Sequence, residues 1–178
     1  MKTNFVILAT IISLTFISCK NDKKEDVTKA DEKQNFSIDL DVVAPLDDNF
    51  SVYYTEDNTI NFNGDNAVWR GVKGQSDIQQ VTLVLKEEII PTNIRIDFGI
   101  NKDQGDIVLE KFKLSFYGKS FEAKGSEFFK YFIPNDSVKT EIDSVKGTVK
   151  FLKNSKKFFT PFYYPQQAVL DEIKKITH

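Results

Sequence analysis

The sequence predicts an all-β domain, a jelly-roll-like β-sandwich with a short helix near 126–132 and a C-terminal helix. Apolar and polar residues alternate in several segments, which is the pattern of half-buried strands. Roughly eight such segments recur at intervals of about ten residues with turn residues between them, as in sandwiches and jelly rolls. The chain has neither an internal repeat nor the alternation of strands and helices that builds a parallel sheet.

Each strand is expected where this alternation is clearest. The first strand sets Phe36, Ile38 and Leu40 between polar residues, and the segment 45–49 after it has the composition of a turn. The expected strands are 36–44, 50–54, 69–72, 78–85, 93–98, 106–116, 121–123 and 144–152.

Two helices are expected toward the C-terminus. Ser126 is expected to cap the short helix, which places Phe128, Phe129 and Phe132 on one side. Apolar residues at helical spacing predict an amphipathic helix over 166–176.

The composition favours one globular domain without catalytic groups. The 178 residues are 40% hydrophobic and 28% charged, which suffices for one core. The net charge of −2 provides no excess of positive charge to attract nucleic acid. The only histidine is the terminal His178 and the only cysteine is Cys19, so no nucleophile–histidine or zinc-binding arrangement is present in the sequence. We therefore expect a protein that is not an enzyme and has no cofactor.

Acidic residues leave two alternatives open. Carboxylate pairs such as Asp39 and Asp41 would serve a glycoside hydrolase if two carboxyl groups faced each other across a cleft. Asp103 and Asp106, on either side of Gly105, would serve a structural calcium ion.

The N-terminus has the layout of a signal peptide. A short basic start precedes thirteen mostly apolar residues, 5–17, which are too few to span a bilayer comfortably. The run ends in Phe16-Ile17-Ser18-Cys19, which resembles the bacterial lipoprotein signal, with Phe16 at the position where leucine is usual. The resemblance implies cleavage before Cys19, a diacylglycerol on its thiol and a further acyl chain such as palmitate on its amine. The alternative is a short membrane anchor with an incidental cysteine.

This resemblance divides the chain into a signal peptide (1–18), a lipidated tether (19–34) and a β-sandwich (35–178). Residues 20–33 are rich in charge and poor in apolar side chains, so we expect a disordered tether. Two or three acyl chains would hold the protein stably on a lipid bilayer. The mixed charges after Cys19 resemble the export signal of surface-exposed lipoproteins. The expected location is the outer membrane, with exposure at the cell surface.

The segment 91–121, PTNIRIDFGINKDQGDIVLEKFKLSFYGKSF, resembles the central part of galactose-binding-like jelly rolls. The resemblance implies a jelly roll and sugar binding. Strand alternation places Arg95 and Asp97 together on the outer face of their strand. Trp69 and Arg70 are candidates for an aromatic platform and a second guanidinium. The alternative is an ordinary ion pair between Arg95 and Asp97, with Trp69 in the core.

We therefore expect a membrane-anchored, non-catalytic envelope lipoprotein that binds glycan through Trp69, Arg70, Arg95 and Asp97. The alternative is a structural or assembly lipoprotein that binds another envelope protein. A concave outer face shared by Trp69, Arg95 and Asp97 favours the glycan. A buried Trp69 beside an exposed patch of phenylalanines favours the protein partner.

Overall fold

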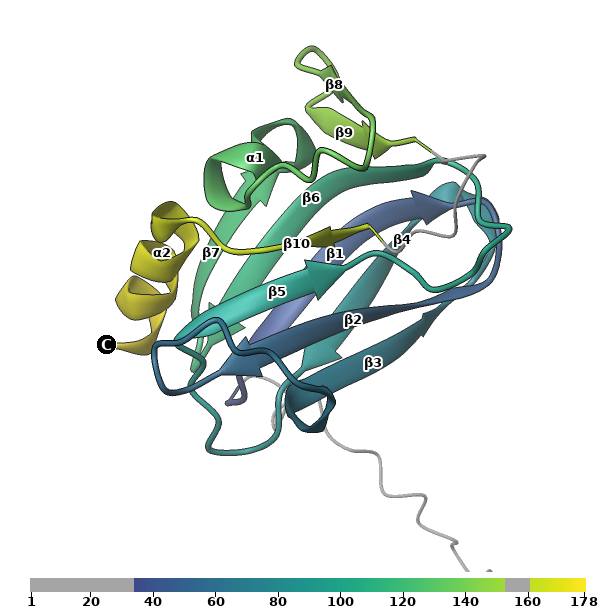
Figure 1. The fold of residues 1–178 in the computed structure, drawn as a ribbon. Coiled ribbons are helices and arrows are strands. Elements are labelled where there is room, and N and C mark those ends of the chain that lie inside the picture. The colour runs from purple at the N-terminus through teal and green to yellow at the C-terminus, as the bar shows by residue number, and fades with distance from the viewer. Residues whose placement is uncertain (1–33, 153–160) are drawn as a thin grey trace, which may run out of the picture.

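The computed structural model describes residues 34–152 and 161–178, which form two antiparallel sheets stacked face to face (Figure 1). The predicted all-β sandwich, with a short helix and a C-terminal helix, is confirmed. Cys19 and the expected signal peptide lie outside the described residues, as does the expected tether up to residue 33. Within the described ranges, no helix is long and apolar enough to cross a membrane.

The two sheets divide the strands as follows. Sheet A runs in the order β4 (Gln75–Val84), β1 (Ser37–Ala44), β6 (Ile107–Phe116), β9 (Thr148–Phe151) and β8 (Thr140–Asp143), and β7 (Lys119–Lys124) also pairs with β6. Sheet B runs in the order β10 (Phe162–Tyr163), β5 (Asn93–Asp97), β2 (Asp48–Thr55) and β3 (Ala67–Val72).

The strand pairs are nested in sequence and alternate between the two sheets, which makes the sandwich jelly-roll-like. β1 pairs with β6 in sheet A, and β2, the next strand in sequence, pairs with β5 in sheet B. β1 also pairs with β4, while β2 pairs with β3. The chain therefore crosses between the sheets after β1, β3, β4, β5 and β9.

The core lies between the sheets and is rich in aromatic rings. Ile94, Ile96 and Phe98 are fully buried, as the alternation in this segment predicts. Phe98 contacts the rings of Phe151 and Tyr163 at centroid distances of 4.7 and 5.9 Å. The other fully buried aromatic residues of this core are Phe36, Phe50, Phe112, Phe128 and Phe132.

Two α-helices close the β7 side of the sandwich (Figure 1). α2 (Gln167–Thr177) confirms the predicted amphipathic helix and packs against β6 and β7. Its buried residues are Val169, Ile173 and Ile176. α1 (Phe128–Tyr131) is a single turn that contacts α2 and places Phe128 in the core.

The prediction that Ser126 caps the short helix is wrong. Ser126 lies inside the 3-10 turn η3 (Gly125–Glu127), and α1 begins after Glu127 without a side-chain cap. The path is set by Gly125, because a Cβ at this position would overlap the carbonyl oxygen of Leu109. The chain can leave β7 so close to β6 only with glycine here.

The prediction of one strand over 144–152 is also wrong. Residues 144–147 form the turn of a hairpin, in which β9 pairs with the preceding strand β8 and Thr148 lies opposite Asp143. The carboxylate of Asp143 accepts hydrogen bonds from the backbone N–H groups of Val145 and Lys146, at 3.0 and 2.9 Å. Gly147 closes the turn with φ of +80°, a conformation that favours glycine.

Candidate functional site

The outer face of sheet B brings together three of the four predicted ligand-binding residues. Ser51 of β2 lies opposite Trp69 of β3 on one side and Asp97 of β5 on the other. Tyr53 and Arg95 lie opposite each other, one step further along the same face. Trp69, Arg95 and Asp97 therefore share one surface, as expected from the strand alternation.

Arg95 and Asp97 form a two-pronged ion pair. Nε of Arg95 donates to Oδ1 of Asp97 and Nη2 donates to Oδ2, both at 2.8 Å. The two side chains are only 17% and 7% exposed. Burial opposes the charge on Arg95, but the hydrogen bond and charge of Asp97, together with Tyr164, raise the pKa of the guanidinium. Burial raises the pKa of the Asp97 carboxyl, and the hydrogen bond and charge of Arg95 lower it only in part.

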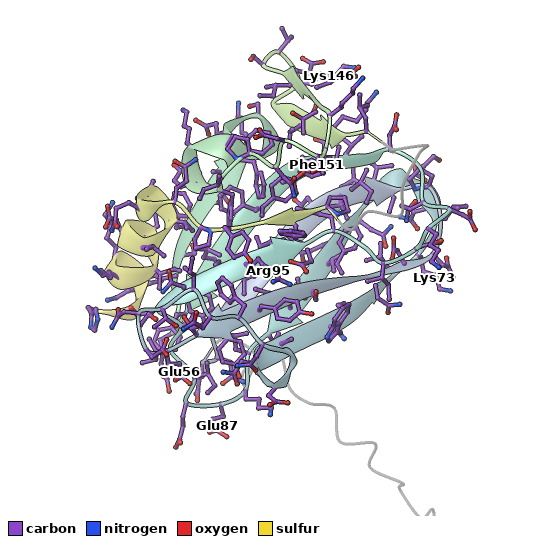
Figure 2. The ribbon with its side chains drawn as sticks, viewed as in Figure 1. Glu56, Lys73, Glu87, Arg95, Lys146 and Phe151 are labelled. Carbon is purple, nitrogen blue, oxygen red and sulfur yellow. The ribbon has the colours of Figure 1, made fainter. Side chains whose placement is uncertain are left out.

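Arg95 is also surrounded by four aromatic rings, which we call the arginine sleeve: Tyr53, Phe62, Phe162 and Tyr164. The guanidinium carbon lies 4.0 Å from the centre of the Tyr53 ring and 5.3 to 5.8 Å from the other three. These distances are within the range of cation–π attraction. Figure 2 shows Arg95 near the middle of sheet B. Arg95 thus connects the loop after β2 and the C-terminal segment to β5. Its Nε and Nη2 atoms already donate hydrogen bonds to Asp97.

Trp69 is the open aromatic residue of this face. Its side chain is 46% exposed, so the alternative of a core position is wrong. Its ring meets Tyr53 edge to face, at a centroid distance of 6.2 Å and an interplanar angle of 74°. This contact fixes the ring while leaving one surface free, which is the geometry of a stacking platform.

Arg70 does not share this surface. It lies opposite Phe50, a core residue, on the side of β3 that faces the other sheet. Its Nε donates to the carbonyl oxygen of Thr82 in β4 at 3.0 Å. The expectation that Trp69 and Arg70 act side by side is therefore wrong in its geometry, because consecutive residues of a strand point to opposite faces.

An open groove is lined in part by Gly71 and Asn49, which share the outer face of sheet B with Trp69. Gly71, two residues further along β3, lies opposite Asn49 of β2. The groove has a volume of about 590 Å³ and is lined by Asp47, Asp48, Asn49, Gly71, Val72, Lys73, Ile100 and Asn101. Within the part of the chain that is described, the side chain of Asn49 has no hydrogen-bond partner and lies at the exposed surface.

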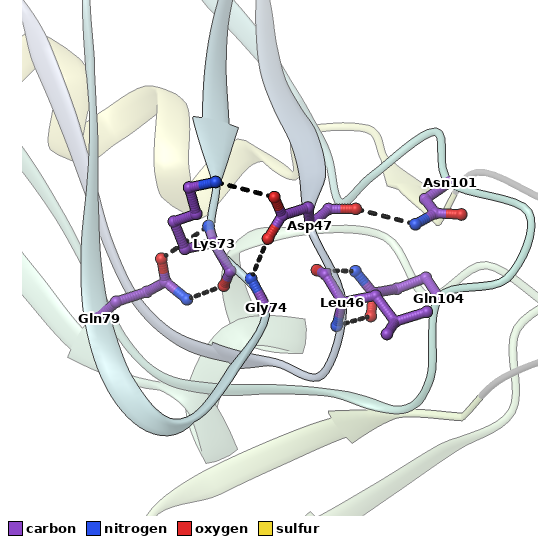
Figure 3. Close-up of polar contacts among 7 residues, drawn as sticks. All are labelled: Leu46, Asp47, Lys73, Gly74, Gln79, Asn101 and Gln104. Atoms are coloured by element: carbon purple, nitrogen blue, oxygen red, sulfur yellow. Dashed lines mark hydrogen bonds and ion pairs between the residues drawn. The ribbon is translucent and has the colours of Figure 1, made fainter.

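The far wall of the groove is a network of paired polar groups (Figure 3). Asp47 accepts from the backbone N–H of Gly74 at 2.7 Å and from Nζ of Lys73 at 2.9 Å. These two contacts lower the pKa of Asp47, and the Asp47 carboxylate raises the pKa of Lys73. The side chain of Asn101 donates to the carbonyl oxygen of Asp47 at 2.8 Å.

The loop 99–105 is held from beneath by Asp48 and Gln104. Oδ1 of Asp48 accepts from the backbone N–H groups of Ile100 and Asn101, at 2.7 and 2.9 Å. Gln104 donates to Oδ2 of Asp48 at 3.1 Å and to the carbonyl oxygen of Leu46 at 2.8 Å, while its own oxygen accepts from the N–H of Leu46 at 3.0 Å. Gly99, with φ of +92°, makes room for the Asp48 carboxylate.

The calcium alternative named Asp103 and Asp106 in this loop. Both residues take part in interactions within the fold. Among the residues in the described ranges, no group of three or more His, Cys, Asp or Glu side chains is placed to hold a metal ion. A calcium ion here stays a prediction, and Asp48 and Gln104 supply the polar contacts that fix the loop.

Within the described part of the chain, one buried hydroxyl on this face lacks a hydrogen-bond partner. Ser51, between Trp69 and Asp97, is fully buried, and its Oγ has no hydrogen bond. Buried polar groups are rarely left unpaired, so an unpaired hydroxyl beneath a surface calls for an explanation.

Sequence reasoning missed the arginine sleeve and the groove. Arg95 contacts three rings from distant parts of the sequence, those of Phe62, Phe162 and Tyr164. No local sequence pattern predicts these contacts. Asn49 and Gly71 face each other only through the β2–β3 register. Comparison with protein-family models, with curated proteins and with solved structures gives no match for this chain.

Proposed function

We propose that this protein is a lipid-anchored lipoprotein of the outer membrane that binds a glycan, without catalysis, on the outer face of sheet B. One observation carries the proposal: the half-exposed ring of Trp69 lies on the same face as an open groove, which begins at Gly71, two residues further along β3. An indole face offers sugar C–H groups an apolar platform, and nearby polar groups orient the hydroxyls.

The roles within this face follow from the geometry. Trp69 is the platform, and Asn49 provides a free amide at the mouth of the groove. Arg95 and Asp97 serve the ligand indirectly, because their polar atoms are committed to each other and they hold Tyr53 against Trp69. They are positioning residues in this proposal, and Arg70 has no part in it.

The anchor half of the proposal depends on Cys19. With two or three acyl chains at this residue, the charged tether would hold the sandwich away from the bilayer. In cells that process lipoproteins, we expect Cys19→Ser to move the protein from the membrane fraction to the soluble fraction. A full-length Cys19→Ser protein that stays in the membrane would contradict lipid attachment.

A glycan array tests the binding half. The lipidated full-length protein in detergent is applied together with Trp69→Ala and with Tyr117→Asn. Tyr117 is a matched control, because it is also an exposed aromatic residue, with φ of 47° that asparagine tolerates, and it lies in the turn after β6. We expect binding that Trp69→Ala abolishes and Tyr117→Asn preserves, with the bound glycan recovered intact. No binding across a broad array would contradict the proposal.

A second function is favoured by a separate observation. Beyond the arginine sleeve, a smaller depression of about 280 Å³ is lined by Ile133, Pro134, Asn135, Asp136, Ser137, Phe162 and Tyr164. Ile133 is half exposed there. Apolar surface of this kind suits a protein partner, so an assembly lipoprotein that binds another envelope protein is the alternative. Loss of partner capture in Ile133→Ser, with glycan binding absent, would support that alternative.

A further inference from the structure

Building on the proposed function, we infer that the glycan is uncharged and spans at least two sugar units, one stacked on Trp69 and the next in the groove beyond Gly71. The inference rests on two features of the described residues: the balance of charge among the side chains that line the groove, and the open path that Gly71 leaves.

The cation that lines the groove is already paired. Lys73 is paired with Asp47 at 2.9 Å, and Arg95, further along the same face, is paired with Asp97 by two hydrogen bonds. Lys102, on the loop that borders the groove, takes part in an interaction as well. Arg70 points to the other side of its strand and donates to Thr82. Lys73 is the only cation among the described residues that line the groove, and Asp47 offsets its charge.

An acidic ligand would also meet negative charge. The groove is lined by two carboxylates, Asp47 and Asp48, against one cation, Lys73, so a ligand carboxylate would lose hydration and meet a net negative charge. The group that stands ready for a ligand is uncharged: the free side-chain amide of Asn49. Amides recognise hydroxyl groups as both donors and acceptors, which suits a neutral sugar.

The path from Trp69 into the groove is open because of Gly71. The two residues are separated by two steps of one strand, about 6.8 Å along the same face, which is close to the length of one sugar unit. A Cβ at Gly71 would meet nothing closer than Oδ1 of Asn49 at 3.8 Å. A Cβ can therefore be added at Gly71 without a clash, and the methyl groups of a valine would narrow the entrance to the groove.

The test uses the full-length lipidated protein and an array in which neutral chains stand beside their uronic-acid counterparts: glucan and glucuronan, galactan and galacturonan, mannan and mannuronan hexamers, among broader glycans. We expect a neutral chain to bind at least about tenfold more tightly than its uronate, with little change in Kd when the salt concentration is raised. Asp47→Asn frees the charge of Lys73, so we expect it to improve uronate binding by about threefold or more.

Gly71→Val tests the second sugar unit, with Gly64→Val as its control. Gly64 has open space around its Cβ position and lies in the turn η2 (Gly64–Asn66). We expect Gly71→Val to reduce affinity for the neutral hexamer about tenfold and to leave binding of the methyl monosaccharide unchanged. Gly64→Val should change neither.

The outcomes separate the two claims. Tighter binding of a uronate, or equal affinity for the hexamer in wild type and Gly71→Val, would overturn this inference while leaving glycan binding intact. Absence of binding to every glycan would overturn the proposed function and this inference with it.

Discussion

The outer faces of the two sheets obey the same strand alternation but carry opposite chemistry. On sheet A, charged side chains face solvent: Asp41 pairs with Lys111 at 3.1 Å, and Asp39 accepts from the hydroxyl of Thr82 at 2.6 Å. The outer face of sheet B instead carries Trp69, the arginine sleeve and the buried ion pair of Arg95 and Asp97.

This difference is the reason why we place the proposed ligand site on sheet B. A solvent face needs only charge, and its ion pairs contribute little to stability. Aromatic rings on an outer face do not aid hydration, and they raise the risk of aggregation unless another molecule covers them. Asp39 and Asp41 lie side by side on one strand, so they do not face each other across a cleft as a hydrolase pair would.

The strongest way to test this contrast is to remove one carboxylate from each face. Asp97→Ala leaves Arg95 largely buried without its partner, so we expect a loss of about 3 kcal/mol in the free energy of unfolding. Asp41→Ala removes a partly exposed pair and should cost less than about 1 kcal/mol. Urea unfolding measures both, and equal losses would show that the two faces do not differ in kind.

The next contrast concerns glutamines that support each face. Gln104 has four hydrogen bonds beneath the groove, whereas the side chain of Gln80 has one long contact to Asp41 at 3.5 Å on sheet A. We expect Gln104→Ala to cost about 2 kcal/mol, because the N–H of Leu46 loses its partner. Gln80→Ala should stay within about 0.5 kcal/mol. Thermal unfolding of the two variants decides whether the loop 99–105 is clamped as described.

Trp69 should separate function from stability. Trp69→Ala removes an exposed ring and its contact with Tyr53, so we expect a loss of no more than about 1 kcal/mol in the free energy of unfolding. Its effect on glycan affinity should be far larger. A stability loss of several kcal/mol, measured by urea unfolding, would instead assign Trp69 a structural role.

The smallest expected effect is the pH dependence of Asp47. Its pKa is lowered below the ordinary 3.8 by the N–H of Gly74 and by Lys73, so its contribution to stability is present above about pH 4 and is lost as the pH falls through the lowered value. The stability difference between wild type and Asp47→Asn should therefore shrink as the pH is lowered from 6 to about 3. A difference that grows toward low pH would contradict the assignment.

The sequence was most informative where structure is local. Alternation correctly predicted the buried set Ile94, Ile96 and Phe98, and helical spacing correctly predicted α2. The β8–β9 hairpin was missed because Val145, which lies in the turn, was read together with Val149 and Phe151 as one strand. Gly147 carried the signal, since a glycine after Asp143 suits the left-handed turn that the hairpin needs.

The site was only partly predictable for a related reason. Alternation within one strand placed Arg95 and Asp97 on one face, and the same rule, applied to Trp69 and Arg70, would have separated them. The groove depends on the register between β2 and β3 and on a loop clamped by Asp48, more than fifty residues away in sequence. Such contacts follow from the assembled sandwich and leave no local pattern.

Trp69 is the only tryptophan of the chain, so its fluorescence reports on the candidate site alone. The most direct measurement is a titration of the wild-type protein with the best neutral glycan from the array, followed by tryptophan emission and by iodide quenching. We expect a blue shift and protection from iodide that saturate at the Kd obtained by calorimetry. Calorimetric binding with no change in the emission or quenching of Trp69 would place the glycan elsewhere and contradict the account.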